Sequence, residues 1–397
     1  MAGVMAESVR SSTISREELD RRTALVRARL KDLNADALVV VGSLNDLSGH
    51  LRWLTDASLS YRRVVVVHRD DLLTVIEHGA AGEARKLDGQ QPGYIGVGEV
   101  FFQSTFPSVR FTQRYEAELV RDLLRRRGYR RVAVIDGDGM PHGFFETLAD
   151  DGAFELIDDT EYFDAAKAVK SPQEQDRIRA AARLQDEVFA ALLPQLKPGM
   201  CDFEVSALAE YEAKRRGGQF GIVLSGSASP GAPAFFRSFE NQGRRIRSGD
   251  ALSILIENGS PDGYFVEMSR TIVFGPAWSE LRESFEQVLR LQQFVIGLMQ
   301  PGASCSGIHR RYQEYAAAHG LRADRRLYAH GQGFDLVERP LIREDESMDL
   351  APGMCLAVHP PAVVGDSFAS LCDNILVTAR GAEPLHRTEK RIFEIAT

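Results

Sequence analysis

The sequence predicts a two-domain protein of the α+β class, and three observations predict it. Its 397 residues are enough for more than one domain. Up to about residue 150, charged helix-like stretches alternate with short β-branched runs. Beyond that point, two helical stretches precede a strongly alternating segment that is typical of an antiparallel hairpin. We expect the first domain over residues 1–160 and the second over 161–397.

The elements of the first domain follow from its hydrophobic periodicity. Apolar residues at helical spacing among charged residues predict helices over 17–32 and 115–127. Short runs rich in valine and isoleucine predict strands over 37–41, 63–67, 72–76 and 131–135. This alternation of helix and strand favours an α/β arrangement for the first domain.

The second domain begins with a clear helix start, because Ser171 stands before Pro172 as an N-cap before a first-turn proline. The predicted helices cover 172–195, 202–216, 280–299 and 305–319. The predicted strands cover 220–224, 251–257, 264–274, 353–358 and 374–378. The turn sequence NGSPDG joins the second and third of these strands, and it predicts a β-hairpin.

Charge and cysteine content exclude several classes of protein. The 48 basic and 56 acidic residues give a net charge of −8, which argues against a general nucleic-acid or anionic-membrane surface. The four cysteines form no CxxC pair, so a reducing compartment is favoured over a disulfide scaffold. No apolar run approaches the roughly 18 residues of a membrane span, and the start lacks a secretory pattern. We expect a cytoplasmic protein with neither nucleic-acid nor membrane partners.

Two glutamates lie symmetrically about the predicted turn. In a regular hairpin Glu257 and Glu267 oppose each other and point to the same face of the sheet. Close carboxylates repel when both are ionised, which raises the pKa of one and makes an acid–base pair, unless a cation lies between them. The alternative is a pair of solvated acids on the flanks of an exposed turn.

Three further residues could carry chemistry. His330 lies beside Gly331 in the stretch AHGQG, which allows close backbone approach. His359 ends an apolar strand before two prolines, and Cys372 stands at the entrance to the last strand. Each has a structural alternative, since a lone histidine or cysteine is commonly a buried packing residue.

Five segments together resemble the creatinase and prolidase-like "pita-bread" family, the M24-type group that includes methionine and proline-specific aminopeptidases. The segments are AVKSPQEQDRIRAA, SGDALSILIENG with DGYFVEMSRTIVFG, LYAHGQGFDLVERP, APGMCLAVHP and LCDNILVTARG. The resemblance implies a pita-bread C-terminal domain, with a curved mixed or antiparallel sheet and covering helices, after a smaller creatinase-type α/β domain.

The resemblance also locates the family's metal ligands, and this chain departs from them. The metalloenzymes of the family carry Asp at the positions of Glu257 and Glu267, His at His330, and Glu at His359 and Cys372. Four carboxylates neutralise the charge of two divalent ions in those metalloenzymes, whereas this chain retains only two carboxylates at these positions. We therefore expect no metal and no other cofactor.

The function implied is that of a metal-independent hydrolase, similar to creatinase and ectoine hydrolase, cleaving a C–N bond of a small polar amidine, amide or cyclic substrate. Glu257 or Glu267 would act as base or nucleophile, and His330 or His359 as acid. Glu338 matches a glutamate of the family and completes the expected catalytic set.

Two alternatives stay open. The first is a mononuclear metal-dependent Xaa-Pro-type aminopeptidase or dipeptidase with one zinc or manganese ion, because Glu, His and Cys are acceptable zinc ligands. The second is a non-catalytic binding protein on the same fold.

The partners expected are a small-molecule substrate and a second copy of the chain in a homodimer. The resemblance implies the homodimer, because subunits of this family pair at the edges of their active sites. Cys372 is expected to contact the substrate in the cleft, and Arg52, Trp53 and Arg110 are expected to meet an anionic or planar substrate from the first domain.

Overall fold

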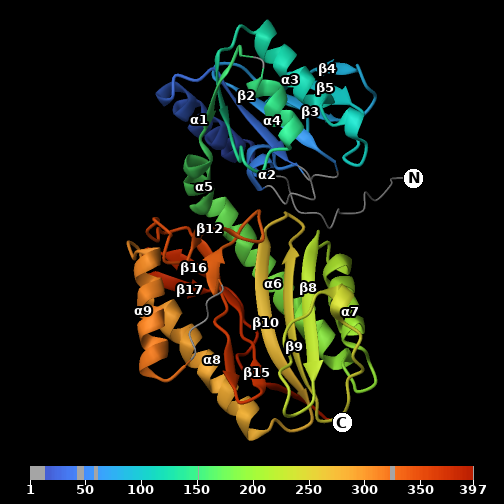
Figure 1. Cartoon of the computed structure of the whole chain (residues 1–397), viewed down its shortest axis with the longest axis vertical. Coiled ribbons are helices and arrows are strands. Elements are labelled where there is room, and N and C mark those ends of the chain that lie inside the picture. The colour runs from blue at the N-terminus through green and yellow to red at the C-terminus, as the bar shows by residue number, and fades with distance from the viewer. Residues whose placement is uncertain (1–13, 43–48, 58–60, 151, 322–326, 397) are drawn as a thin grey trace, which may run out of the picture. The chain divides into compact units, whose positions relative to one another are not determined.

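The computed structural model describes the chain except for residues 1–13, 43–48, 58–60, 151, 322–326 and 397 (Figure 1). Contacts within it divide the described residues into two compact units, one ending at Lys167 and the next beginning at Ala168. None of the helices in the described part has both the length and the apolar character that a membrane crossing requires.

Seven strands of the described N-terminal unit form one mixed sheet, in the order β4-β5-β3-β2-β1-β6-β7. The strands are β1 Ala37–Gly42, β2 Arg63–His68, β3 Leu73–His78, β4 Ala84–Lys86, β5 Val97–Gln103, β6 Arg131–Val134 and β7 Glu155–Asp158. The helices are α1 Arg16–Asp32, α2 Gly49–Thr55, α3 Tyr115–Arg126, α4 His142–Ala149 and α5 Thr160–Ala168. Buried side chains of α3 and α4 share a core with β1, β2 and β6, as expected for an α/β layer.

The C-terminal unit holds, in its described residues, a four-stranded sheet, a five-stranded sheet and a two-stranded ribbon. The first sheet has the order β18-β10-β9-β8, with β8 Gly221–Ala228, β9 Ala251–Gly259, β10 Phe265–Phe274 and β18 Phe393–Ile395. The second has the order β12-β11-β13-β16-β17, with β11 Ala329–Gly331, β12 Glu338–Leu341, β13 Cys355–Val358, β16 Asp373–Thr378 and β17 Gly381–Pro384. The ribbon pairs β14 Ala362–Val364 with β15 Ser367–Ala369.

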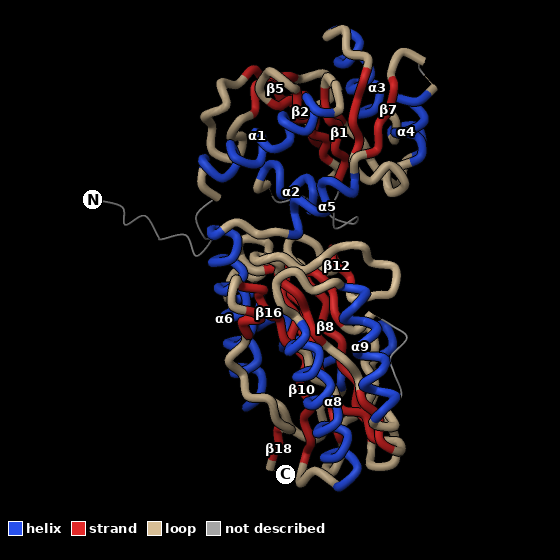
Figure 2. The backbone as a smooth tube through the Cα atoms, turned by 90° about the vertical axis from the view of Figure 1, so that its left-hand side faces the viewer, coloured by secondary structure: helices blue, strands red, loops and turns tan. Residues whose placement is uncertain are grey.

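In the C-terminal unit, the four-stranded and the five-stranded sheet are each covered by their own pair of helices (Figures 1 and 2). Helices α6 Pro172–Leu192 and α7 Asp202–Arg215 pack on β8, β9 and β10, and helices α8 Ser279–Leu298 and α9 Cys305–Ala318 pack on the five-stranded sheet. The start of α6 forms the predicted cap, because Ser171 Oγ accepts from the backbone N–H of Glu174, whose side chain accepts from the N–H of Ser171. The predicted α+β class is confirmed.

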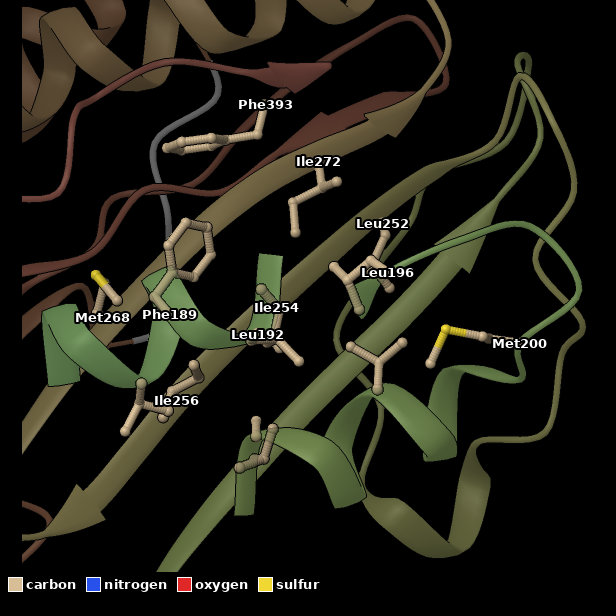
Figure 3. Packing of buried hydrophobic residues seen from close by; sticks show 14 of the residues in the cluster. Phe189, Leu192, Leu196, Met200, Leu252, Ile254, Ile256, Met268, Ile272 and Phe393 are labelled. Atoms are coloured by element: carbon tan, nitrogen blue, oxygen red, sulfur yellow. The ribbon is translucent and has the colours of Figure 1, made fainter. Parts of the chain in front are cut away.

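Alternation along the predicted hairpin separates a packing face from a polar face. Ile254 and Ile256 of β9, with Met268 of β10, pack on Phe189 of α6 (Figure 3). The residues between them point the other way, and Glu257 pairs with Glu267 in register. Both carboxylate residues are buried, at 6% and 3% exposure, so the predicted opposition is confirmed and the solvated-turn alternative is wrong.

A buried arginine links the four-stranded and five-stranded sheets of the C-terminal unit. Arg270 of β10 is fully buried, and its Nη2 lies 2.7 Å from Oδ1 of Asp373 at the start of β16. Its other N–H groups donate to backbone carbonyls, including that of Cys372 at 2.9 Å. Burial opposes ionisation of Asp373, but the charges of Arg270 and Lys390 hold the pKa of this carboxyl below its usual value.

Replacing Arg270 by Met leaves Asp373 buried with its strongest partner missing. We expect the free energy of unfolding of this unit to fall by about 3–5 kcal/mol, the usual cost of breaking a buried ion pair from one side. Urea unfolding of the full chain measures the change. The control is Arg282→Met, which breaks an exposed pair with Glu394 and should cost at most about 1 kcal/mol. Equal losses in the two variants would contradict the assignment.

Candidate active site

A cavity of about 460 Å³ lies in the C-terminal unit, and its wall contains four ionisable side chains. These are Glu257 and Glu267 from the hairpin, His330 from β11 and His359 just after β13. Much of the remaining wall is apolar: Ile222, Leu224, Phe236, Leu255, Val337 and Phe368 are among its members. A concave apolar site with a few convergent polar groups is the usual form of a small-molecule site.

Backbone pairing explains why the histidines reach the glutamates. His330 lies on β11, whose neighbour β13 runs antiparallel to it, and His359 follows the end of β13. The N–H of His359 donates to the carbonyl of Tyr328 at 2.8 Å, which fixes the start of the loop. Gly331 permits the close packing of β12 on β11, because a Cβ there would lie 2.5 Å from the carbonyl oxygen of Arg339.

Three of these side chains form a group that could hold one metal ion. The ligand atoms of Glu267, His330 and His359 all lie within 4.8 Å of one another. Nε2 of His330 lies 3.5 Å from Oε2 of Glu267, and the two imidazole rings have centroids 5.2 Å apart. Two imidazoles and one carboxylate are a known donor set for a catalytic zinc ion.

The outer nitrogen of His330 fits the same interpretation. Its Nδ1 lies 2.9 Å from the carbonyl oxygen of Gly331, which assigns the Nδ1 proton to this hydrogen bond. Nε2, the other ring nitrogen, then faces Glu267. Metal-binding histidines commonly donate their other N–H to a backbone carbonyl in this way. The residues present therefore fit one divalent ion.

The two glutamates differ in ionisation. Burial and the charge of Glu267 raise the pKa of Glu257 well above its usual value. Burial also opposes ionisation of Glu267, but the charges of His359 and His330 outweigh it and hold its pKa below the usual range. The structure thus divides the pair into a carboxylate that faces the imidazoles and a carboxyl that retains a proton more readily.

Two residues that the sequence analysis did not identify hold Glu257 in place. Nε2 of Gln332 donates to Oε1 of Glu257 at 2.6 Å, and Nδ2 of Asn374 donates to Oε1 of Gln332 at 2.8 Å. Oδ1 of Asn374 in turn accepts from the backbone N–H of Glu267 at 2.6 Å. All four residues are buried, so this chain of hydrogen bonds links the side chain of one glutamate to the backbone of the other.

The remaining predicted site residues occupy other places. Glu338 on β12 is buried and pairs with Lys170. Cys372 does not line the cavity; its thiol donates to the carbonyl of Glu267, and burial and the charge of that glutamate raise its pKa well above normal. A protonated thiol of this kind is a poor metal ligand. The roles predicted for Glu338 and Cys372 stay predictions.

The other predicted substrate contacts belong to the N-terminal unit. Trp53 is buried on α2, with the guanidinium of Arg22 5.5 Å from its ring centroid, and Arg52 precedes it on the same helix. Arg110 is exposed at the start of a short 3₁₀ helix. Their proposed contacts with a substrate stay predictions.

Comparison with known proteins establishes the family. The profile of metallopeptidase family M24 matches residues 176–379, which is half of the chain. The chain belongs to metallopeptidase family M24. This confirms the predicted pita-bread resemblance and the predicted enzyme class, since metallopeptidases hydrolyse C–N bonds of peptides.

Relatives across this M24 family are distant in sequence and close in fold. The chain is 25% identical over 266 residues to an Xaa-Pro dipeptidase of Pyrococcus horikoshii, covering 64% of this chain and 73% of the relative. It is 24% identical over 377 residues to a creatinase of a Bacillus species, covering 89% and 85%. The crystal structure of an X-Pro aminopeptidase from Thermotoga maritima superposes with a TM-score of 0.78 at 15% identity, covering 94% and 99%.

The expectation that this M24 chain needs no metal is wrong. That expectation counted the carboxylates required by two ions, and a single divalent ion requires fewer. Glu267, His330 and His359 supply a compact three-ligand set, and the relatives include proteins named Xaa-Pro dipeptidase in a family of metallopeptidases. The mononuclear alternative fits the site better than the metal-independent interpretation.

Proposed function

We propose that this chain is a mononuclear metal-dependent hydrolase of small Xaa-Pro-type amide substrates. The observation that carries the proposal is the group formed by Glu267, His330 and His359 in the wall of the cavity. Relatives named Xaa-Pro dipeptidase and X-Pro aminopeptidase support the substrate class. One bound divalent ion would polarise the scissile carbonyl and lower the pKa of a coordinated water.

Glu257 is the proton-transfer residue in this proposal. It lies in the cavity wall opposite Glu267, and its raised pKa brings it closer to the range that suits a general base at neutral pH. With Oε1 held by Gln332, Oε2 takes the proton from the attacking water and returns it to the leaving nitrogen. Glu267 keeps its negative charge throughout and would hold the ion together with His330 and His359, while the carbonyl of Gly331 orients the imidazole of His330.

Removal of metal tests the proposal directly. Protein dialysed against a chelator is assayed with a panel of Xaa-Pro dipeptides and their amides, before and after addition of Zn²⁺, Mn²⁺ or Co²⁺. We expect hydrolysis to be lost on chelation and to return as the added ion reaches one equivalent per chain. Full hydrolysis by the chelated protein would contradict the proposal, as would a requirement for two equivalents.

The homodimer and the cytoplasmic location also belong to the proposal. The dimer is supported by the resemblance to the pita-bread family, in which two subunits meet at the edges of their active sites. Light scattering at micromolar concentration should give twice the chain mass of 44.0 kDa, and a monomeric mass would contradict the dimer.

A further inference from the structure

The cavity wall combines ionisable groups at one place with apolar groups elsewhere. Beyond Glu257, Glu267, His330 and His359, its polar side chains are the hydroxyls of two serines. Among the residues that the structure describes, no lysine or arginine lines this cavity. A carboxylate placed against Phe236 and Phe368 would lose its hydration and gain no partner from these two side chains, which is costly.

Aromatic rings form one side of this wall. Phe236 and Phe368 both line the cavity, and their ring centroids are 5.7 Å apart in an edge-to-face arrangement. Phe235 packs edge-to-face on the same Phe368 at 5.0 Å and is itself half exposed. Such a surface favours an apolar or aromatic group of a ligand over a charged one.

Ser370 is the second feature of the wall. Both backbone polar groups of Ser370 bond the hydroxyl of Thr271. The N–H of Ser370 donates to Oγ1 of Thr271 at 2.9 Å, and the carbonyl of Ser370 accepts from that hydroxyl at 3.1 Å. Its own Oγ is buried and has no hydrogen-bond partner among the described residues. Buried hydroxyls are usually hydrogen-bonded, so the Oγ of Ser370 is available to bond a ligand group.

We propose that this cavity accepts substrates that are apolar and uncharged on the side of Ser370, and that Ser370 Oγ hydrogen-bonds an uncharged polar group of the substrate. This substrate class rests on the proposed hydrolase function. The proposal also places the carboxyl end of the substrate on the side of Ser370, so that amides with a blocked carboxyl end are selected over dipeptides with a free carboxylate. Ser370 is thereby a specificity residue of the site.

The test compares two matched ligands, Phe-Pro with a free carboxylate and Phe-Pro-amide. We expect kcat/KM for the amide to exceed that for the free acid by at least about tenfold. Ser370→Ala should lower kcat/KM for the amide by about three- to tenfold, the value of one hydrogen bond, and change that for the free acid little. A preference for the free acid, or an S370A variant that treats the amide as the wild type does, overturns the inference.

Ser253 provides the matched control. Its Oγ is also buried without a hydrogen-bond partner among the described residues, but Ser253 does not line the cavity. Ser253→Ala should leave the amide-to-acid ratio unchanged, and a change equal to that of Ser370→Ala would overturn the assignment of Ser370.

Calorimetry with prolinamide and proline as ligands separates this inference from the hydrolase function. Tighter binding of prolinamide without turnover of any substrate supports the cavity's preference while the hydrolase proposal fails. Turnover with tighter binding of proline keeps the hydrolase proposal and overturns the preference. Binding of neither ligand also overturns it.

Discussion

Replacing His330 by Ala should lower the affinity for Zn²⁺ or Mn²⁺ by more than about 100-fold. Loss of an outer partner of a metal ligand already costs about 10- to 100-fold, and His330 is placed to be a ligand itself. Its Nε2 faces Glu267 while Nδ1 is engaged with the backbone, so its loss leaves one imidazole and one carboxylate. Titration of the chelated variant with each ion, followed by calorimetry, measures the change, and kcat/KM should fall in parallel at limiting metal.

His319→Ala is the control for that experiment. His319 is exposed at the end of α9, and its ring lies tilted against that of Tyr315, with centroids 4.1 Å apart, rather than against any member of the site. Its replacement should leave metal affinity and hydrolysis unchanged. Unchanged affinity in the His330→Ala variant would remove this histidine from the ligand set.

Replacing Glu257 by Gln should lower kcat by about 100- to 10,000-fold while the protein still binds one equivalent of metal. General-base catalysis contributes a factor of that size, and Glu257 is not a member of the proposed ligand group. The free energy of unfolding should stay the same or rise, because repulsion from Glu267 is removed. Steady-state rates, metal content and urea unfolding of the same preparation measure these effects.

Gln332→Met separates the position of Glu257 from its chemistry. This variant keeps the length of the side chain and removes the hydrogen bond to Oε1 of Glu257. We expect kcat to fall by about tenfold with KM nearly unchanged, as for the loss of an orienting partner. Two fully active variants, Glu257→Gln and Gln332→Met, would exclude Glu257 from the mechanism.

The hairpin could be predicted in detail because its signals are local. Alternation along residues 251–257 and the NGSPDG turn determine the register that sets Glu257 opposite Glu267. The strand that carries His330 could not be predicted this way, because β11 has three residues and its partners lie on β12 and β13. Its place beside the glutamates followed from the family resemblance.

The orienting residues were missed because their contacts are distant in sequence. Gln332 and Asn374 are 42 residues apart. Their polar groups find their hydrogen-bond partners only in the folded chain, where the hairpin lies beside β16. The signal available was a polar residue between Gly331 and Gly333, two positions after His330. The error about metal arose similarly, since a count of carboxylates does not reveal that two imidazoles converge on Glu267.

The central claim is that one divalent ion binds to Glu267, His330 and His359. Crystals grown with Zn²⁺ and measured at the zinc absorption edge test it most directly. We expect one anomalous peak per chain, about 2.0–2.2 Å from a carboxylate oxygen of Glu267 and from a ring nitrogen of each histidine. Two peaks in the cavity, or a single peak without contact to these three side chains, would contradict it.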